Sequence, residues 1–116
     1  MEKLFIKHYD EVCSVYFELN QYANNDNLAV IMLTDDVIVD EPFHYCTVNL
    51  GMMLQMGYGY IDDKVVPGLV SWLEENGLGS RVGGCFAQSG FNMYQLFKFD
   101  MDELLKYTKY DRRKTK

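Results

Sequence analysis

The sequence predicts an α+β fold: a mostly antiparallel sheet of four to five strands with two helices packed on one face. Three observations favour this class. Apolar and polar side chains alternate in several short segments, as half-buried strands require. Two later segments carry helix-capping residues with apolar side chains at helical spacing. The chain has 116 residues, 48% of them hydrophobic, which suffices for one domain with its own core.

The first predicted strands lie between residues 13 and 50. From Cys13 to Leu19 every second side chain is apolar, the period of a strand with one buried face. Residues 24–27 read Asn-Asn-Asp-Asn, a composition typical of a turn. Leu28–Leu33 is apolar on both faces and is expected to be a central strand. After the short β-prone piece Val37–Val39 comes the third main strand, Phe43–Leu50. Strands joined in this order favour an antiparallel meander.

Two helices are expected in the second half of the chain. Pro67 suits the first turn of a helix, and Asn76-Gly77 suits its end. Asp100 with Glu103 resembles a capping box that begins the final helix, with lysines 106 and 109 near its end.

The glycine-rich segments are harder to assign. Gly51–Tyr60 is interpreted as an irregular connection, and Gly77–Gly90 as a flexible or tightly turned stretch. Phe91–Phe99 alternates again and predicts a strand. The whole is expected to be one domain over residues 1–111, followed by a frayed basic tail over residues 112–116.

The net charge of −6 conceals a strong segregation along the chain. Residues 10–75 hold twelve acidic side chains and one lysine, whereas residues 98–116 hold seven basic and four acidic side chains. An acidic body of this kind repels DNA and attracts basic surfaces. Composition therefore disfavours a conventional nucleic-acid binder.

Four acidic doublets fall at predicted turns and helix ends. Solubility is the simplest explanation of such placement. The functional alternative is mimicry of nucleic acid, because a row of carboxylates can occupy a channel lined by Arg and Lys that normally holds phosphates. Under that hypothesis the partner-binding residues are Asp35, Asp36, Asp40, Glu41, Asp62 and Asp63.

No catalytic residue, metal site or cofactor is predicted. His44 and Cys46 share a strand face, but a nucleophile pair needs fixed hydrogen-bond geometry and a third orienting group. The acidic doublets lack the spacing of a calcium loop. The glycines of residues 77–84 lack the phosphate-loop patterns. Aromatic residues in Tyr58–Tyr60 and Phe91–Tyr94 are expected to be core and rim residues, because no basic groove is evident beside them.

A cytoplasmic location is expected. The first eight residues lack the apolar core of a signal peptide, and the longest apolar run, Leu28–Leu33, is too short to span a bilayer. Cys13, Cys46 and Cys85 show neither a disulfide nor a zinc pattern, so reduced, buried thiols are expected.

Seven short segments follow one another in a distinctive order: Tyr22-Ala23, Leu28–Val30, Glu41–Phe43, Thr47–Leu50, Glu74–Gly79, Ser89–Phe91 and Phe99-Asp100. With them the chain resembles, over roughly residues 15–105, a small uncharacterised bacterial domain family carried on conjugative and integrative elements of Gram-positive bacteria. The chain departs from this family in having only Arg81 as a basic residue after the Gly77–Gly79 turn, and in the insertion Val37–Val39.

The resemblance implies an accessory role on a mobile element, and some small acidic proteins of such elements block defence nucleases. The leading hypothesis is therefore a non-enzymatic inhibitor of a bacterial defence nuclease, of the anti-CRISPR type, whose acidic surface occludes a cationic nucleic-acid channel. The partner is then a protein, a CRISPR effector or another defence nuclease, with no direct nucleic-acid or membrane contact. The first alternative is an interaction module of a conjugative element, monomeric or a homodimer that pairs an exposed strand edge. The second is nucleic-acid binding through the tail at residues 112–116.

Overall fold

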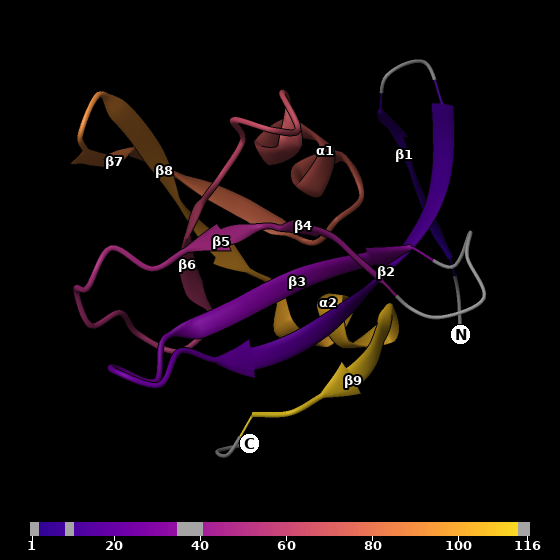
Figure 1. The fold of residues 1–116 in the computed structure, drawn as a ribbon, viewed down its shortest axis with the longest axis horizontal. Helices are drawn as coiled ribbons and strands as arrows, with labels where there is room; N and C mark the ends of the chain where they lie inside the picture. The colour runs from indigo at the N-terminus through magenta and orange to yellow at the C-terminus, as the bar shows by residue number, and fades with distance from the viewer. Residues whose placement is uncertain (1–2, 9–10, 35–40, 114–116) are drawn as a thin grey trace.

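Two sheets and two short helices make up the structure (Figure 1). This computed structural model describes residues 3–8, 11–34 and 41–113. The predicted α+β class with mostly antiparallel strands is confirmed, but the chain forms a five-stranded and a four-stranded sheet where one was expected. The packing of both helices on one face stays a prediction. In chain order the elements are β1 (Leu4–His8), β2 (Glu11–Gln21), β3 (Leu28–Thr34), β4 (Glu41–Tyr45), β5 (Thr47–Val48), β6 (Tyr58–Ile61), α1 (Leu69–Glu75), β7 (Gly79–Ser89), β8 (Asn92–Phe99), α2 (Met101–Lys106) and β9 (Thr108–Asp111).

The first sheet has the antiparallel order β1-β2-β3-β4, so the predicted meander over β2, β3 and β4 is confirmed. The predicted turn between β2 and β3 is present, and Asp26 adopts a positive φ of 59° there. Two strands of this sheet were not predicted: β1, which pairs with β2 in antiparallel, and β9, which pairs with β2 in parallel, Phe17 lying opposite Thr108. The expected final helix therefore stops at Lys106, and the segment that follows it is a strand.

Cys46 is the point at which the chain passes from the first sheet to the second. Its N–H donates to the Val30 carbonyl in β3 (2.9 Å), and its carbonyl accepts from the Asp62 N–H after β6 (2.9 Å). The strand predicted over Phe43–Leu50 is therefore two strands, β4 and β5, in different sheets. The Thr47 hydroxyl supports this junction by accepting from the Val30 N–H at 3.1 Å.

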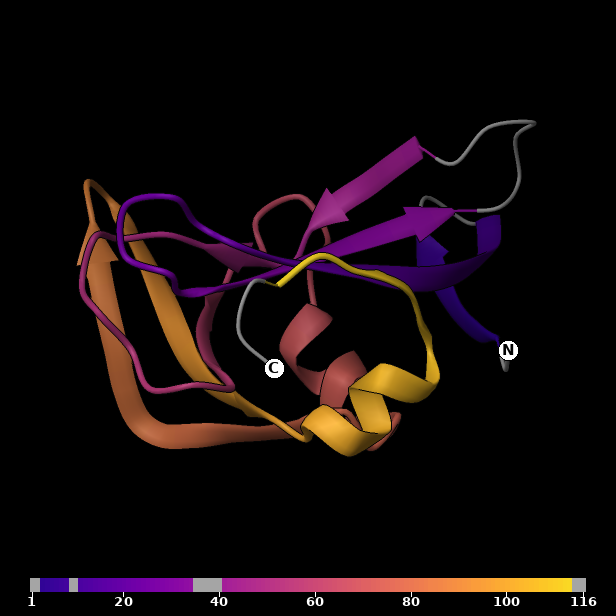
Figure 2. The same cartoon turned by 90° about the horizontal axis from the view of Figure 1, so that it is seen from below.

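The second sheet has the order β5-β6-β8-β7 and contains a long hairpin. Gly90, with φ 61°, takes the first central position of the two-residue turn between β7 and β8, as a type II′ turn requires. The hairpin bends sharply (Figure 2), and its pairing register shifts between Arg81 and Phe86. At this bulge the Gln95 side-chain amide donates to the carbonyls of Val82 (2.7 Å) and Cys85 (3.0 Å).

Gly77–Gly90 is thus mainly a strand, and its expected assignment as a flexible stretch is wrong. The glycines serve the strand in particular ways. Gly79 has a φ of 148° and lies so close to β8 that a side chain would collide with Phe97 and Phe99. Gly84, with φ 76°, lies in the bulge, where residues 82–85 stand opposite Leu96 alone and leave the regular ladder.

One continuous apolar core is shared by both sheets and both helices. Phe17 from β2 and Phe97 from β8 are its largest fully buried side chains. Leu73 from α1 and Leu104 from α2 are also completely buried in it. Burying side chains of this size contributes roughly 1.5–3 kcal/mol each, so the two sheets stabilise each other through the core.

Helix α1 lies within the predicted limits, and α2 begins at the predicted cap but ends before Lys109. Asp100 is the N-cap of α2, and its side chain accepts from the Glu103 N–H, which confirms that half of the predicted capping box. Beside the end of α1, Glu74 binds Arg81 at the start of β7. One Glu74 oxygen accepts from the Arg81 N–H at 2.9 Å and the other from its guanidinium at 2.8 Å.

Replacing Gly79 by alanine should strongly destabilise the fold. The added Cβ would lie 2.6 Å from Phe97 Cε2 and 2.9 Å from Phe99 Cα, at a φ that other residues rarely adopt. We expect Gly79→Ala to lower the free energy of unfolding by about 3 kcal/mol, measured by urea denaturation. The control is Gly83→Ala, which meets no atom within 4 Å and should change it by less than about 0.5 kcal/mol. Equal midpoints for the two variants would contradict the close approach.

The contact between Glu74 and Arg81 should make stability depend on pH in the acid range. Hydrogen bonds from the Arg81 side chain and then its backbone N–H lower the pKa of Glu74 below its ordinary value of 4.5. A lowered carboxyl pKa contributes stability at neutral pH that is lost as the pH falls through the folded-state pKa. We expect Glu74→Gln to melt below the wild type at pH 7, and the two Tm values to converge below pH 4.5. Glu75→Gln, outside this contact, is the control and should melt like the wild type.

Candidate protein-binding surface

The outer face of the second sheet carries a row of tyrosines. Tyr60 of β6 lies opposite Leu96 of β8, and Tyr58 lies opposite Lys98, so these side chains share one face. Tyr94 is on the same face, two residues before Leu96. The alternate residues of these strands, such as Phe97, turn inward to the core. We call Tyr58, Tyr60, Tyr94 and Leu96 the tyrosine face.

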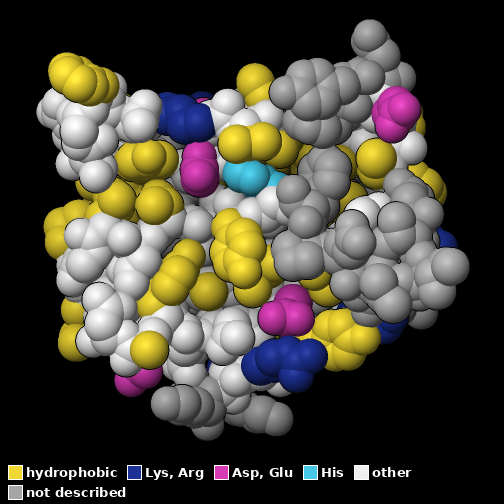
Figure 3. Space-filling model, viewed as in Figure 1, with side chains coloured by type: hydrophobic (Ala, Val, Ile, Leu, Met, Phe, Trp, Pro, Cys, Tyr) yellow, Lys and Arg dark blue, Asp and Glu magenta, His cyan; other side chains and the backbone are white. Residues whose placement is uncertain are grey.

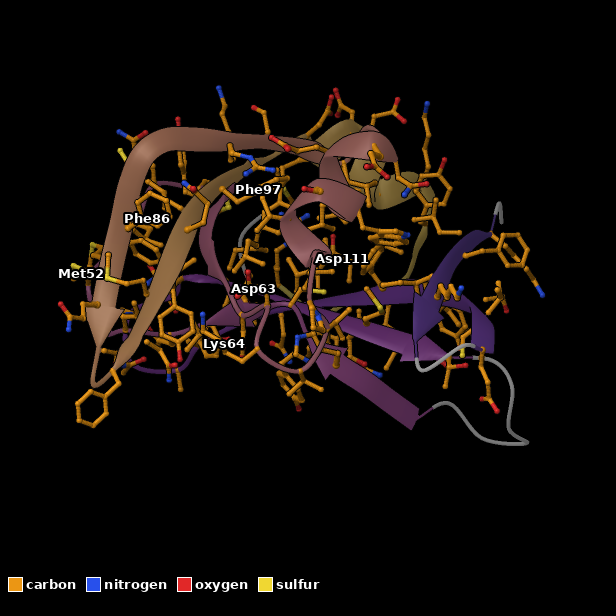
Figure 4. The ribbon with its side chains drawn as sticks, turned by 90° about the horizontal axis from the view of Figure 1, so that it is seen from above. Met52, Asp63, Lys64, Phe86, Phe97 and Asp111 are labelled. Carbon is orange, nitrogen blue, oxygen red and sulfur yellow. The ribbon has the colours of Figure 1, made fainter. Side chains whose placement is uncertain are left out.

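A methionine-rich segment borders the tyrosine face. It follows β5 and exposes Met52, Met53 and Met56, the second of which is 80% exposed. A shallow groove of about 300 Å³ lies between this segment and the sheet, lined by Met53, Leu54, Gln55, Tyr58 and Leu96. Figure 3 shows hydrophobic side chains over the left half of the molecule, where β5, β6 and the β7–β8 hairpin lie. Met52 and Phe86 lie at this same end (Figure 4).

Two lysines cover tyrosines of this face. Lys98 Nζ lies 5.9 Å from the ring centroid of Tyr58, and Lys64 Nζ lies 5.4 Å from that of Tyr94. Lys64 also donates to the Met93 carbonyl at 3.1 Å and forms an ion pair with Asp63 at 3.3 Å (Figure 4). These are single cation–π contacts at typical distances, and the two lysines do not form a basic groove beside the rings.

Of the six residues predicted to bind a partner, the structure describes the side chains of two. Asp62 and Asp63 follow β6 at the edge of the tyrosine face, and an Asp62 carboxylate oxygen accepts from the Lys64 N–H at 3.1 Å. Asp35, Asp36 and Asp40 lie outside the described residues. Glu41 begins β4, and its side chain is outside the description as well.

Several described carboxylates are engaged by cations of the same chain. Such contacts reduce the negative field that a basic partner would meet, although exposed pairs of this kind stabilise the fold only slightly. They also lie on different elements rather than in one row. The pairs are Glu18–Arg112, Asp63–Lys64, Glu74–Arg81, Glu103–Lys106 and Asp111–Arg113.

The described part of the basic tail is held against the body. The Arg112 N–H donates to the Leu19 carbonyl at 2.8 Å, and its guanidinium lies 4.9 Å from the ring centroid of Tyr110. Arg113 binds Asp111 at 2.8 Å, and its side chain is only 8% exposed. These two cations are thus committed to contacts within the chain.

His44 and Cys46 do not form an activated pair. Burial, with a smaller contribution from Asp62, raises the pKa of the Cys46 thiol, which keeps it protonated and unreactive at neutral pH. A ring nitrogen of His44 instead contacts the Asp62 carbonyl at 2.8 Å. Both side chains are buried and help to join the sheets.

Two further features bear on ligand binding. A hollow of about 540 Å³ lies beside the start of β7 and is lined by Gly77, Gly79, Ser80, Lys98, Phe99, Asp100 and Met101. Asp100 in this lining is the N-cap of α2. A phosphate site needs hydrogen-bond donors at such a position, whereas a carboxylate would repel the phosphate. Within residues 3–8, 11–34 and 41–113, no group of three metal-ligating side chains is present. Nor does any helix in these segments have the length and apolarity to cross a bilayer.

A family model described as a domain of unknown function, DUF4313, matches residues 16–116. The chain belongs to the DUF4313 family. Curated proteins and solved structures contain no match to it. The resemblance to a small uncharacterised domain family is thereby confirmed for this DUF4313 protein, while the association with mobile elements stays a prediction.

The tyrosine face was missed because its residues come from segments that were interpreted separately. Gly51–Tyr60 was expected to be irregular, yet its end forms β6 and pairs with β8. The alternation in Phe91–Phe99 does separate Tyr94 and Leu96 from the core residues. Without the pairing of β6 with β8, nothing in the sequence places Tyr58 beside them.

The three free cysteines should differ in reactivity. Cys46 is fully buried with a raised thiol pKa, whereas Cys85 in β7 is exposed, contrary to the expectation that all three are buried. We expect a chromogenic disulfide reagent at pH 8 to modify Cys85 within the mixing time and Cys46 only after unfolding. Mass spectrometry of tryptic peptides would identify the modified residue, and Cys85→Ser is the control. Fast labelling of Cys46 in the folded protein would contradict its protection.

Proposed function

We propose that this DUF4313 protein is a non-enzymatic binding module whose partner is a protein, and that the tyrosine face is its contact surface. The observation that supports this is the gathering of the partly exposed Tyr58, Tyr60 and Leu96 side chains on one sheet face, beside the exposed Met52, Met53 and Met56. Tyr94, on the same face, is buried and supports the surface from beneath. Tyrosine and methionine are enriched in protein interfaces, and methionine adapts its shape to a partner. The groove beside Met53 offers a pocket for an apolar anchor.

The charge layout favours a protein partner over a nucleic acid. Lys64 is paired with Asp63, and the chain as a whole carries a net charge of −6. Stacking platforms for single strands combine aromatic rings with a continuous cationic groove. Lys98 and Lys64, the second of them neutralised by Asp63, do not make a continuous cationic groove.

The partner class that we carry forward is a bacterial defence nuclease, in keeping with the family resemblance and the acidic composition. The protein would inhibit it by covering its nucleic-acid channel without taking part in a reaction. In this form of the proposal, the tyrosine face supplies the apolar contact. Asp62, Asp63 and the acidic residues of the 35–41 segment supply complementary charge, which steers association and weakens with salt.

The test is a DNA-cleavage assay with purified CRISPR effector and guide RNA at increasing molar excess of the DUF4313 protein. We expect cleavage to fall, and Leu96→Asp to require about tenfold more protein, because it places a charge in the centre of the contact. The matched control is Leu105→Asp on α2, an exposed leucine outside this face, which should inhibit like the wild type. Thermal unfolding of both variants separates loss of contact from loss of fold.

Three outcomes are informative about the mechanism. Undiminished cleavage at large excess would discard inhibition of that effector. Loss of inhibition in Leu96→Asp alone supports the tyrosine face. Loss of inhibition in the double variant Asp62→Asn, Asp63→Asn, together with inhibition that weakens strongly with salt, would instead support charge mimicry as the main source of binding.

A further inference from the structure

The outer edge of β7 is an open strand edge. β7 ends the strand order of the second sheet, and among the residues that the structure describes β8 alone pairs with it. In an antiparallel ladder every second residue of an edge strand turns its N–H and C=O away from its neighbour. The two-residue turn makes Ser89 and Asn92 the closing hydrogen-bonded pair, so Phe86 and Gln88 present their backbone groups outward.

The two halves of this edge are treated differently. Near the start of β7, the outward N–H of Arg81 is capped by the Glu74 carboxylate at 2.9 Å, so this half cannot accept another strand. Beyond the bulge, no side chain of the described segments caps the N–H of Phe86 or Gln88. Such open edges pair with other strands unless charges, prolines or coverings prevent it.

The distal half carries none of the usual protection against pairing. Residues 82–91 contain no charged side chain and no proline, in a chain whose net charge is −6. Phe86 and Met93 are 52% and 50% exposed. They lie on the same face of the hairpin, because Met93 is opposite Gln88, which is two residues from Phe86 in β7. Strand pairing would therefore bury apolar surface as well as satisfy backbone groups.

We propose that a second copy of this chain pairs with this edge, β7 to β7, about a twofold axis at Ala87. A second copy is the fitting occupant because the edge is complementary to itself: residues 82–91 carry no charge, and the outward Phe86 and Gln88 can pair with Gln88 and Phe86 of another copy. The acidic bodies of the two copies repel each other, which the contact must overcome. The tip of the hairpin stands away from the first sheet (Figure 1), and repulsion between charges separated by more than about 8 Å is largely screened at physiological salt. A symmetric contact of this type closes at a dimer.

The position of the axis follows from the outward residues. Centred on Ala87, the Phe86 of one copy lies opposite the Gln88 of the other, so all four outward residues form hydrogen-bonded pairs. A twofold axis at Phe86 or at Gln88 would leave some outward backbone groups without a partner or opposite the bulge at residues 82–85. In the Ala87 register Cys85 lies opposite Ser89 of the other copy. Cα atoms of such a non-hydrogen-bonded pair lie about 4.5 Å apart, within the range a disulfide spans.

The test combines oligomeric state with cross-linking. Light scattering after size exclusion should show a dimer for the wild type. Gln88→Pro should be monomeric, because it removes an outward N–H that β8 does not use. Phe86→Lys should also weaken the dimer, with Phe91→Lys at the turn as the control of equal charge. Circular dichroism establishes that each variant is folded.

Oxidation then locates the contact. Ser89→Cys, with the native Cys85 present, should form a disulfide-linked dimer, whereas Ser89→Cys combined with Cys85→Ser should not. A wild type that is monomeric at every concentration overturns the inference, as does a dimer that persists in Gln88→Pro or that fails to cross-link in Ser89→Cys. None of these results bears on nuclease inhibition, because this edge is distinct from the tyrosine face.

Discussion

The peptide groups on either side of Cys46 hold the two sheets together. The N–H of this residue binds β3 of the first sheet and its carbonyl binds the chain after β6 of the second, each at 2.9 Å. Its side chain is fully buried among both sets of strands. A backbone group buried at such a junction must find a partner, because leaving it unpaired costs roughly 1–3 kcal/mol. The relative placement of the sheets, and hence of every surface on them, depends on this crossing.

That placement leaves the second sheet covered on one face only. Its inner face completes the core through Phe97 and Phe99, and its outer face carries the tyrosines. Charged residues near the tyrosines contact other residues of the same chain: Lys64 forms an ion pair with Asp63 and lies over the ring of Tyr94. Preformed contacts of this kind hold long side chains in place before a partner arrives, which reduces the entropy lost on binding.

Local sequence patterns predicted the elements whose structure depends mainly on residues close together in the chain. The alternation in Cys13–Leu19 and the apolar run of β3 needed no distant information, and the cap at Asp100 is a contact over three residues. The second sheet could not be predicted in the same way. Gly79 reads as a turn residue, although it is glycine because β8 passes too close for a side chain.

The candidate surface also contains residues that the sequence singles out and residues that it does not. Asp62 and Asp63 were proposed from the sequence because an acidic doublet is a local feature. The tyrosine face depends on the pairing of β6 with β8, segments separated by α1 and β7. The break at Cys46 likewise has no local signal, because the residues on both sides of it favour strands equally well.

The parallel pairing of β9 with β2 has a consequence for the order in which the domain is assembled. Phe17–Leu19 gains its second neighbour only from residues 108–111, at the far end of the domain. While the polypeptide is being synthesised, this part of β2 can pair with β3 on one side, but its other side stays open until residues 108–111 are available. Completion of the first sheet therefore waits for the last strand of the domain, and contacts so distant in sequence slow folding.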